Sequence, residues 1–166
     1  MSAVNSAPEF ESKLTPPQDL KARVAHLPRP IVFTNGVFDL LHRGHVTYLA
    51  QARALGNALI VALNDDASTR RLNKAPDRPI HSLADRAAVI AALESVSLVT
   101  WFSDDTPLAL IESISPDVLA KGGDWPIEQI VGGQWVRARG GKVISIAFDH
   151  ERSTTATLEK IRKPAG

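Results

Sequence analysis

Short continuous apolar segments alternate with longer segments of helical periodicity along most of this chain. Residues 31–33 and 58–63 are apolar at every position, which is typical of strands buried on both faces of a sheet. Between them, a stripe of apolar residues recurs at helical spacing and stops before Gly56-Asn57: Tyr48, Leu49, Ala52 and Leu55. A strand, a helix and a second strand in this order predict a βαβ unit with two parallel strands.

The same alternation continues to the C-terminus. Ser82, with Asp85 three residues later, forms a variant of the capping box and predicts a helix start. Thr15, before two prolines, is expected to cap a helix ahead of the first strand. The remaining pattern predicts helices over 18–26, 86–93, 108–114, 127–137 and 154–162, and strands over 96–102, 117–120 and 142–147. We therefore expect an α/β fold: a single Rossmann-like domain with an open five-stranded parallel sheet and helices on both faces.

Other segments fall outside this periodic pattern. Residues 1–12 are small and polar and are expected to form a flexible N-terminal segment. The domain would then span 13–163, with a short tail over 164–166. Residues 68–78 are polar and basic, and two prolines discourage regular structure, so we expect an irregular loop after the second strand.

Composition is that of a globular protein with one domain. At 166 residues, with 44% apolar and 22% charged residues, the chain can bury a substantial core. A formal net charge of +1 gives no basic excess, so neither nucleic acid nor a membrane surface is expected as a partner. Cysteine is absent, which excludes disulfides and a thiol nucleophile. The sequence shows no leader-like or membrane-spanning apolar run, and we expect a cytoplasmic protein.

The end of the first predicted strand carries the clearest chemistry. The apolar run breaks at Asn35-Gly36 and a helix is expected to open near His42, which places a helix N-terminus at the carboxyl end of a strand. Unbonded backbone N–H groups and the helix dipole favour an anion there. His42 and His45 share one face of the first turn, and Gly44 lets a ligand approach the backbone. This arrangement predicts a phosphate site in which two imidazoles donate hydrogen bonds.

Two other interpretations of the histidine pair stay open. The imidazoles could form half of a metal site, although cysteine is absent and His81 is the only further histidine in the middle of the chain. They could also be ordinary surface histidines. Phosphate contact is favoured because the strand, the turn and the helix start occur together.

Polar residues also follow the later strands. They come after the second, fourth and fifth strands as Asn64-Asp65-Asp66, Lys121-Gly122-Gly123-Asp124 and Ser153-Thr154-Thr155. Ligands of open α/β sheets lie outside the carboxyl ends of the strands, so these groups are expected to face one crevice. Simpler roles stay open: turn formation for Asp65, Asp66 and Lys121-Gly-Gly, an N-cap for 153–155, and a solvated charged face for Arg70, Arg71, Lys74 and Arg78.

The run Thr34-Asn-Gly-Val-Phe-Asp39, followed by His42-Arg-Gly-His45, resembles the signature of the HxGH nucleotidyltransferases in the cytidylyltransferase-like superfamily. Such enzymes move a nucleotidyl group from a nucleoside triphosphate to a phosphate or similar acceptor. His-x-Gly-His alone is a weak signal, but the ordered set of strand, Asn-Gly, Phe-Asp and His-x-Gly-His is much stronger. The resemblance implies the nucleotidyltransferase form of the Rossmann-like fold.

A wider resemblance covers nearly all of the chain from Lys13 to Lys163. The order of further segments resembles the adenylyltransferases of ADP-heptose synthesis, at 64–68, 71–74, 78–80, 85–93, 105–108, 116–124 and 153–155. In many bacteria this unit is the C-terminal half of a two-domain kinase–adenylyltransferase. The resemblance implies transfer of AMP from ATP to D-glycero-β-D-manno-heptose 1-phosphate, with release of pyrophosphate, for the inner core of lipopolysaccharide. A separate heptose kinase and a phosphatase would act upstream.

The sequence departs from this family pattern at three places. Residues 73–78 lack the glycine expected around the family's mobile lysine loop. Trp125 stands where a tyrosine is usual, and Val37 replaces a common cysteine. The latter two changes conserve size and apolar character.

The resemblance also implies roles for individual residues. The catalytic group would be His42, His45, Lys74 and Lys121, with Lys74 closing over the site. The nucleotide would contact Thr34, Asn35, Gly36, Phe38, Gly44, Asn64, Asp65, Gly122, Gly123, Asp124, Ser153, Thr154 and Thr155. The sugar phosphate is assigned, from the expected side of the crevice alone, to Asp39, Arg43, Asp66 and Arg78. The acceptor is already a phosphate monoester, so no general base is required.

ATP is expected to arrive with Mg²⁺, for which Asp39 or Asp65 could be a ligand. Composition and spacing do not separate ATP from CTP. Two alternatives therefore accompany the adenylyltransferase interpretation: a cytidylyltransferase that acts on a small phosphorylated alcohol such as glycerol 3-phosphate, and a non-catalytic nucleotide-binding module on the same fold. The expected partners are ATP and a sugar 1-phosphate, and the expected assembly is a homo-oligomer, with a dimer favoured.

Overall fold

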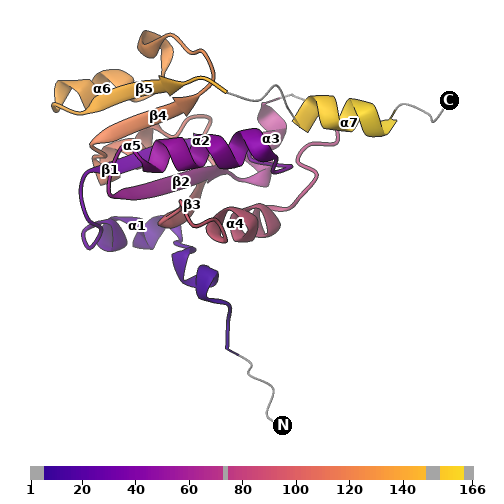
Figure 1. The fold of residues 1–166 in the computed structure, drawn as a ribbon, viewed down its shortest axis with the longest axis horizontal. Coiled ribbons are helices and arrows are strands. Elements are labelled where there is room, and N and C mark those ends of the chain that lie inside the picture. Colours follow the sequence, from indigo (N-terminus) through magenta and orange to yellow (C-terminus); the bar gives the residue numbers. More distant parts are fainter. Residues whose placement is uncertain (1–5, 73–74, 149–153, 163–166) are drawn as a thin grey trace.

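Five strands form one parallel sheet in the order β3-β2-β1-β4-β5 (Figure 1). The structure is a computed structural model that describes residues 6–72, 75–148 and 154–162. The strands are β1 (Ile31–Gly36), β2 (Ala58–Asn64), β3 (Leu98–Phe102), β4 (Val118–Gly122) and β5 (Lys142–Ile146). The predicted α/β class and the five-stranded parallel sheet are confirmed.

Helices connect the strands and follow the last one. Within the described residues they are η1 (Glu9–Lys13), α1 (Pro17–Val24), α2 (Arg43–Arg53), α3 (Asp66–Arg71), α4 (Leu83–Ala91), α5 (Leu108–Ile114), η2 (Ile127–Gln129), α6 (Gly133–Ala138) and α7 (Thr154–Arg162), where η denotes a 3-10 helix. None of the helices in this part of the chain is long and apolar enough to cross a bilayer.

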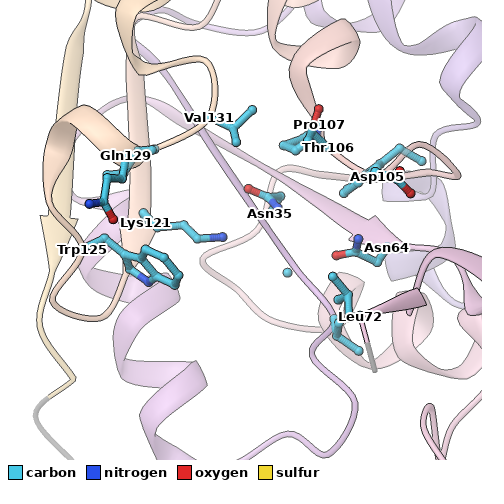
Figure 2. Close-up of a pocket in the computed structure, with 14 residues that line it drawn as sticks. Asn35, Asn64, Leu72, Asp105, Thr106, Pro107, Lys121, Trp125, Gln129 and Val131 are labelled. Atoms are coloured by element: carbon cyan, nitrogen blue, oxygen red, sulfur yellow. The ribbon is translucent and has the colours of Figure 1, made fainter. Parts of the chain in front are cut away.

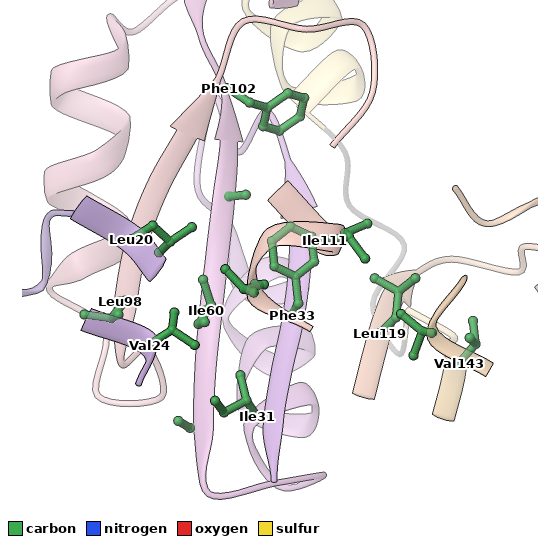
Figure 3. Close-up of a cluster of buried hydrophobic side chains, with 14 of the residues drawn as sticks. Leu20, Val24, Ile31, Phe33, Ile60, Leu98, Phe102, Ile111, Leu119 and Val143 are labelled. Carbon is green, nitrogen blue, oxygen red and sulfur yellow. The ribbon is translucent and has the colours of Figure 1, made fainter. Parts of the chain in front are cut away.

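Alternate residues of the strands point to opposite faces of the sheet and build two apolar cores. Ile31 and Phe33 of β1 pack with residues of α1, α5 and α6 in the cluster of Figure 3. Val32, between them, packs with residues of α2 and α4. All three β1 side chains are fully buried. The sheet is therefore covered on both faces, which explains why its strands are apolar at successive positions.

The strand order reverses at β1. From β1 the chain adds β2 and β3 on one side through α2 and α4, and it then returns to add β4 and β5 on the other side through α5 and α6. The helices that follow β1 and β4 pack on opposite faces of the sheet. Such a reversal opens a crevice at the carboxyl ends of the two neighbouring strands, where ligands of this fold class bind.

The prediction of one continuous helix over 127–137 is wrong, because the chain is not helical in the middle of this range. Ile127–Gln129 form only the short η2, and α6 begins at Gly133. Gly132 has a φ of +81°, and a Cβ at this position would lie 2.7 Å from Cδ1 of Ile111. Glycine is therefore required at 132, and the chain before it cannot continue the helix.

The prediction of an irregular loop over 68–78 is also wrong for its first residues, which belong to helix α3. Asp65 is the N-cap of this helix, since its carboxylate accepts a hydrogen bond from the N–H of Ser68 at 2.7 Å. The helix is short and buries mainly Ser68 and Thr69. With no apolar stripe, it escapes detection by periodicity.

Two predicted helix caps have different outcomes. Ser82 caps α4, because its hydroxyl accepts a hydrogen bond from the N–H of Asp85 at 3.3 Å, and this prediction is confirmed. Thr15 does not cap α1. Its buried hydroxyl accepts a hydrogen bond from the guanidinium of Arg23 at 2.9 Å, and Pro16 occupies the N-cap position.

Part of the N-terminal segment, for which the sequence predicts flexibility, packs on the domain. Within η1, Phe10 contacts the core on the side of α2 and α4. Leu14 then forms an isolated parallel bridge with Val99 of β3. This segment covers an edge strand of the sheet that would otherwise expose unpaired backbone groups.

Candidate active site

Two cavities open at the carboxyl ends of the strands and share Gly36 and Val37 as a border. We call the first the Lys121 cavity. It has a volume of about 330 Å³ and lies above the ends of β1, β2 and β4 (Figure 2). Its lining includes Asn35, Asn64, Leu72, residues 105–107, Lys121, Trp125 and residues 129–131.

We call the second the histidine cavity. Its volume is about 310 Å³. Beyond the shared border it is lined by Phe38, Asp39, His42, His45, Arg78, Phe148, Thr154 and Thr155. The structure therefore brings the predicted histidine pair to the same cavity as the two threonines that open the last helix, 112 positions after His42 in the case of Thr154.

The histidine cavity is built on the N-terminus of α2. His42 is the N-cap residue, with an extended backbone, and the rings of His42 and His45 stack with centroids 3.8 Å apart. The ring of Phe38 meets His45 edge-on at 5.2 Å. Phe38 has a φ of +47°, a left-handed conformation that a bulky residue adopts only where the surrounding structure imposes it. The two imidazoles are thus held as one unit beside the first turn of a helix.

Glycines at the ends of β1 and β4 let aromatic rings lie against the backbone. A Cβ on Gly36 would lie 2.9 Å from Cε2 of Phe38, and one on Gly122 would lie 2.7 Å from Cζ of Phe148. Gly123 has a φ of +101°. The ring of Phe148 therefore covers the Gly122 backbone at the edge of the histidine cavity.

Thr34 and Gly44 line neither cavity, although the sequence places both in the nucleotide site. Thr34 is fully buried, and its hydroxyl is 2.5 Å from the hydroxyl of Tyr48. Burial raises the pKa of Tyr48 to about 12, so this phenol stays protonated and the pair belongs to the core. Gly44 is buried in the first turn of α2 between the two histidines.

Asp39 and Arg78, which the resemblance assigns to the sugar phosphate, line the histidine cavity and form a buried ion pair with each other. The Asp39 carboxylate is 2.5 Å from Nε of Arg78, and the two side chains are 0% and 6% exposed. It also accepts hydrogen bonds from the N–H groups of Ile80 and His81, each at 2.9 Å. Burial alone would raise the pKa of Asp39, but these N–H groups and the guanidinium hold it below its usual value. Asp39 therefore fixes the wall of the histidine cavity, with its oxygens already engaged.

The acidic residues after β2 also support the fold. Besides capping α3, Asp65 accepts a hydrogen bond from the Ser103 hydroxyl at 2.6 Å. Burial would raise the pKa of Asp65, but this bond and the helix N–H hold it below its usual value. Asp66 pairs with the guanidinium of Arg86 at 2.7 Å. Of the three predicted residues in this run, Asn64 is the one that lines a cavity, the Lys121 cavity.

Of the remaining predicted site residues, some line a cavity, some are exposed outside both cavities, and some lie outside the described residues. Lys121 lines the Lys121 cavity, and Thr154 and Thr155 line the histidine cavity. Arg43 and Asp124 are exposed and line neither cavity. The predicted site residues Lys74 and Ser153 lie outside the described residues.

Arg86 is fully buried, and the sequence analysis missed its role. One guanidinium nitrogen donates to the carbonyl oxygens of Val37 at 2.8 Å and Asn64 at 2.9 Å, and Nε donates to that of His81 at 3.1 Å. With its bond to Asp66, the side chain ties the ends of β1 and β2 to α4. A lone arginine beside a run of alanine, valine and isoleucine is the sequence signal that could have indicated a buried cation.

Most of the lining of the Lys121 cavity was also missed, including Leu72, Trp125, Gln129 and Val131. These four come from the end of α3 and from the segment before Gly132, and Leu72, Gln129 and Val131 lie in the two regions whose local structure was predicted wrongly. No motif marks them, because only the folded chain brings them to one cavity.

The described residues do not fit a protein-held Mg²⁺ site. Asp39 and Asp65, the carboxylates considered as ligands, are engaged by a guanidinium, a hydroxyl and backbone N–H groups. Within 6–72, 75–148 and 154–162, no three or more His, Cys, Asp or Glu side chains gather in a way that could hold a metal.

Comparison with known proteins defines the class. The family described as cytidylyltransferase-like matches residues 33–154. That span contains the histidine pair, the border that the two cavities share and the first residue of α7. The chain belongs to the cytidylyltransferase-like family of nucleotidyltransferases.

Curated relatives narrow the assignment. D-beta-D-heptose 1-phosphate adenylyltransferase of Bordetella bronchiseptica is 53% identical over 95% of this chain and 99% of that protein. Bifunctional protein HldE of Hahella chejuensis is 56% identical over 80% of this chain, which spans 28% of the length of that relative. Within its class, the chain therefore belongs to the heptose 1-phosphate adenylyltransferases.

Solved structures agree with the fold. A lipopolysaccharide core biosynthesis protein of Thermoplasma volcanium superposes with a TM-score of 0.57 at 26% identity, covering 74% of this chain and 98% of that one. Pantoate-beta-alanine ligase of Francisella tularensis superposes with a TM-score of 0.60 at 14% identity, covering 91% of this chain and 73% of that one. At this low identity the ligase supports the fold alone.

Proposed function

We propose that this chain transfers AMP from ATP to D-glycero-β-D-manno-heptose 1-phosphate, giving ADP-heptose and pyrophosphate for lipopolysaccharide core synthesis. The observation that carries the proposal is the 53% identity to a heptose 1-phosphate adenylyltransferase over 99% of its length. Two cavities that meet at one border support a reaction between two phosphate-bearing substrates.

The reaction is an in-line substitution at the α-phosphorus of ATP. An oxygen of the sugar phosphate forms the new bond to phosphorus, and the bond to the oxygen that bridges the α- and β-phosphates breaks. Pyrophosphate leaves with the electron pair. The attacking oxygen is already deprotonated near neutral pH, so the protein needs no general base and contributes positioning and charge stabilisation.

The histidine cavity suits the triphosphate. His42 and His45 would donate hydrogen bonds to its oxygens beside the N-terminus of α2, and the N-terminus of α7 at Thr154 and Thr155 would hold the distal end. Lys121 would reach the reacting phosphate from the other side of the border. Phe148 and the glycine backbone at Gly122 offer a surface for adenine.

Three further expectations belong to this proposal. Mg²⁺ would accompany ATP on the triphosphate oxygens rather than on protein carboxylates. The enzyme would act in the cytoplasm, where ATP is available. It would assemble as a homodimer, which size-exclusion chromatography with light scattering can test.

The direct test is pyrophosphate release measured with each of the four ribonucleoside triphosphates and with several phosphorylated acceptors. We expect ATP with heptose 1-phosphate to be used far better than any pair that contains CTP. Equal use of CTP, or activity only with glycerol 3-phosphate, would favour a cytidylyltransferase. ATP binding without turnover on any acceptor would favour a nucleotide-binding module.

A further inference from the structure

We propose that the Lys121 cavity is the acceptor site, with the sugar ring lying between Trp125 and Asn64 and the phosphate directed to Lys121. This inference rests on the proposed function and adds to it the residues that select the sugar. It reassigns Asn35 and Asn64 to the acceptor, whereas the family resemblance implies contacts with the nucleotide.

The histidine cavity already offers what a nucleoside triphosphate requires. The N-termini of α2 and α7 both contribute to its wall, and each presents N–H groups to an anion. Phe148 adds an aromatic face at its edge. The other cavity is therefore left for the second substrate, and the border at Gly36 and Val37 marks where the α-phosphorus would lie.

Three large apolar side chains of the Lys121 cavity are partly exposed. Trp125, Leu72 and Val131 are 49%, 42% and 41% exposed, although all three lie around one concave site. Partly open apolar side chains around a cavity of this size are typical of a ligand surface. A flat indole can pack against the C–H groups of a sugar ring.

Amide groups complete the lining. The side-chain nitrogen of Asn64 donates to the Ser68 hydroxyl at 2.8 Å, which fixes the amide and leaves its oxygen directed into the cavity (Figure 2). Asn35, at the end of β1, lies between Lys121 and Asn64, and Gln129 lies on the side of the cavity away from Asn64 (Figure 2). Amides both donate and accept hydrogen bonds, as recognition of sugar hydroxyls requires.

The charged side chains of the cavity determine how the acceptor is oriented in it. Lys121 and Asp105 lie on opposite sides of it (Figure 2). One oxygen of Asp105 is 2.8 Å from Nε of Arg71, and the carboxylate is otherwise exposed. A phosphate dianion is attracted to Lys121, whereas Asp105 is already paired with Arg71 and keeps an oxygen that can accept hydrogen bonds from sugar hydroxyls. The hydroxyls therefore point to Asp105 and the phosphate to the border. This direction brings the attacking oxygen next to the histidine cavity.

Steady-state kinetics of the full chain test the assignment. Trp125→Ala and Gln129→Ala change exposed side chains, so folding is retained. We expect Trp125→Ala to raise KM for heptose 1-phosphate about tenfold and Gln129→Ala several-fold, with KM for ATP changed by less than about twofold. Trp125→Phe should keep most of the affinity. The matched control is Ile127→Ala, which changes an exposed apolar residue of the same segment that lines neither cavity and should leave both KM values unchanged.

A binding measurement separates this inference from the proposed function. Heptose 1-phosphate added without ATP should change the tryptophan fluorescence of the wild-type chain, and the change should be lost in Trp125→Phe. Absence of turnover in the wild type would reject the proposed function, whatever the variants do. A higher KM for ATP in Trp125→Ala, with KM for the acceptor unchanged, would place the nucleoside in this cavity and overturn the inference. Two unchanged KM values would overturn it as well.

Discussion

The histidine cavity and the Lys121 cavity share a border, yet they are built in different ways. The first depends on the backbone of two helix N-termini and on a pair of histidines three residues apart. The second depends on side chains delivered by four separate parts of the chain. A cavity made by local backbone geometry leaves a short motif in the sequence, whereas one made by distant side chains leaves none.

The two cavities also differ in what holds their walls. A buried ion pair between Asp39 and Arg78 fixes the wall of the histidine cavity. The walls of the Lys121 cavity are connected by Asp65, which caps α3 and also binds Ser103 in the loop after β3. The first wall is therefore buried and strongly held, and the second depends on a partly exposed carboxylate. Each difference can be tested by a substitution that should affect one cavity and spare the other.

The largest effect is expected from His45→Ala. Loss of one preorganised donor to developing charge should lower kcat about 10²–10³-fold, because the stacked imidazole would act mainly on the transition state. KM for ATP should rise much less, and KM for the sugar phosphate should not change. His26→Ala, at an exposed histidine far from both cavities, is the control. Retention of more than about a third of wild-type turnover would exclude the charge-stabilising role.

The next effect concerns stability and pH. Asp39→Asn should lower the free energy of unfolding by about 2–3 kcal/mol at pH 7, since it weakens a buried pair and leaves the guanidinium without its counterion. The pKa of Asp39 in the folded chain is below its usual 3.8, so its contribution is present above about pH 4 and is lost as the pH falls through the lowered value. The stability difference between the two proteins should therefore shrink in acid.

Urea unfolding of the wild type and Asp39→Asn from pH 7 to pH 3 measures this difference. Asp124→Asn, at an exposed aspartate that lines neither cavity, should show no comparable loss. A difference that stays constant down to pH 3 would contradict the ion-pair account.

The smallest effect is expected from Asp65→Ala. Loss of the α3 cap should cost about 1 kcal/mol of stability. Because Leu72 and the loop after Ser103 both line the Lys121 cavity, KM for heptose 1-phosphate should rise several-fold while KM for ATP stays within about twofold. Ser103→Ala, which removes only the tie between the two walls, should reproduce part of the KM change. An equal effect of Asp65→Ala on both substrates would remove the distinction between the cavities.

The sequence could predict the fold because the relevant signals are local. Residues 31–33 and 58–63 are apolar at every position, and such runs between helical stripes leave few alternatives to a parallel sheet. The prediction for the segment before Gly132 was wrong because the relevant signal is not local. Its apolar residues fit a helix, but Gly132 has a left-handed φ of +81°, which interrupts any helix there, and Ile111 from another helix packs where its Cβ would be.

Candidate site residues could likewise be predicted where their signal is local in sequence, but not where it depends on distant contacts. His42 and His45 were identified because a helix start and a strand end adjoin in sequence. Asp39 and Asp66 were assigned to a ligand because position alone does not reveal a partner, and their partners Arg78 and Arg86 are supplied by the fold. Trp125 was noticed only as a change of residue type, since nothing in its neighbourhood indicates a cavity.

The shared border at Gly36 and Val37 has a consequence for product release. With the two substrates assigned as proposed, ADP-heptose occupies both cavities once the new bond forms, whereas pyrophosphate occupies the histidine cavity alone. A bound ADP-heptose then excludes ATP and heptose 1-phosphate together, while pyrophosphate excludes only ATP. Accumulated ADP-heptose would thus inhibit its own synthesis competitively against either substrate, without a separate regulatory site.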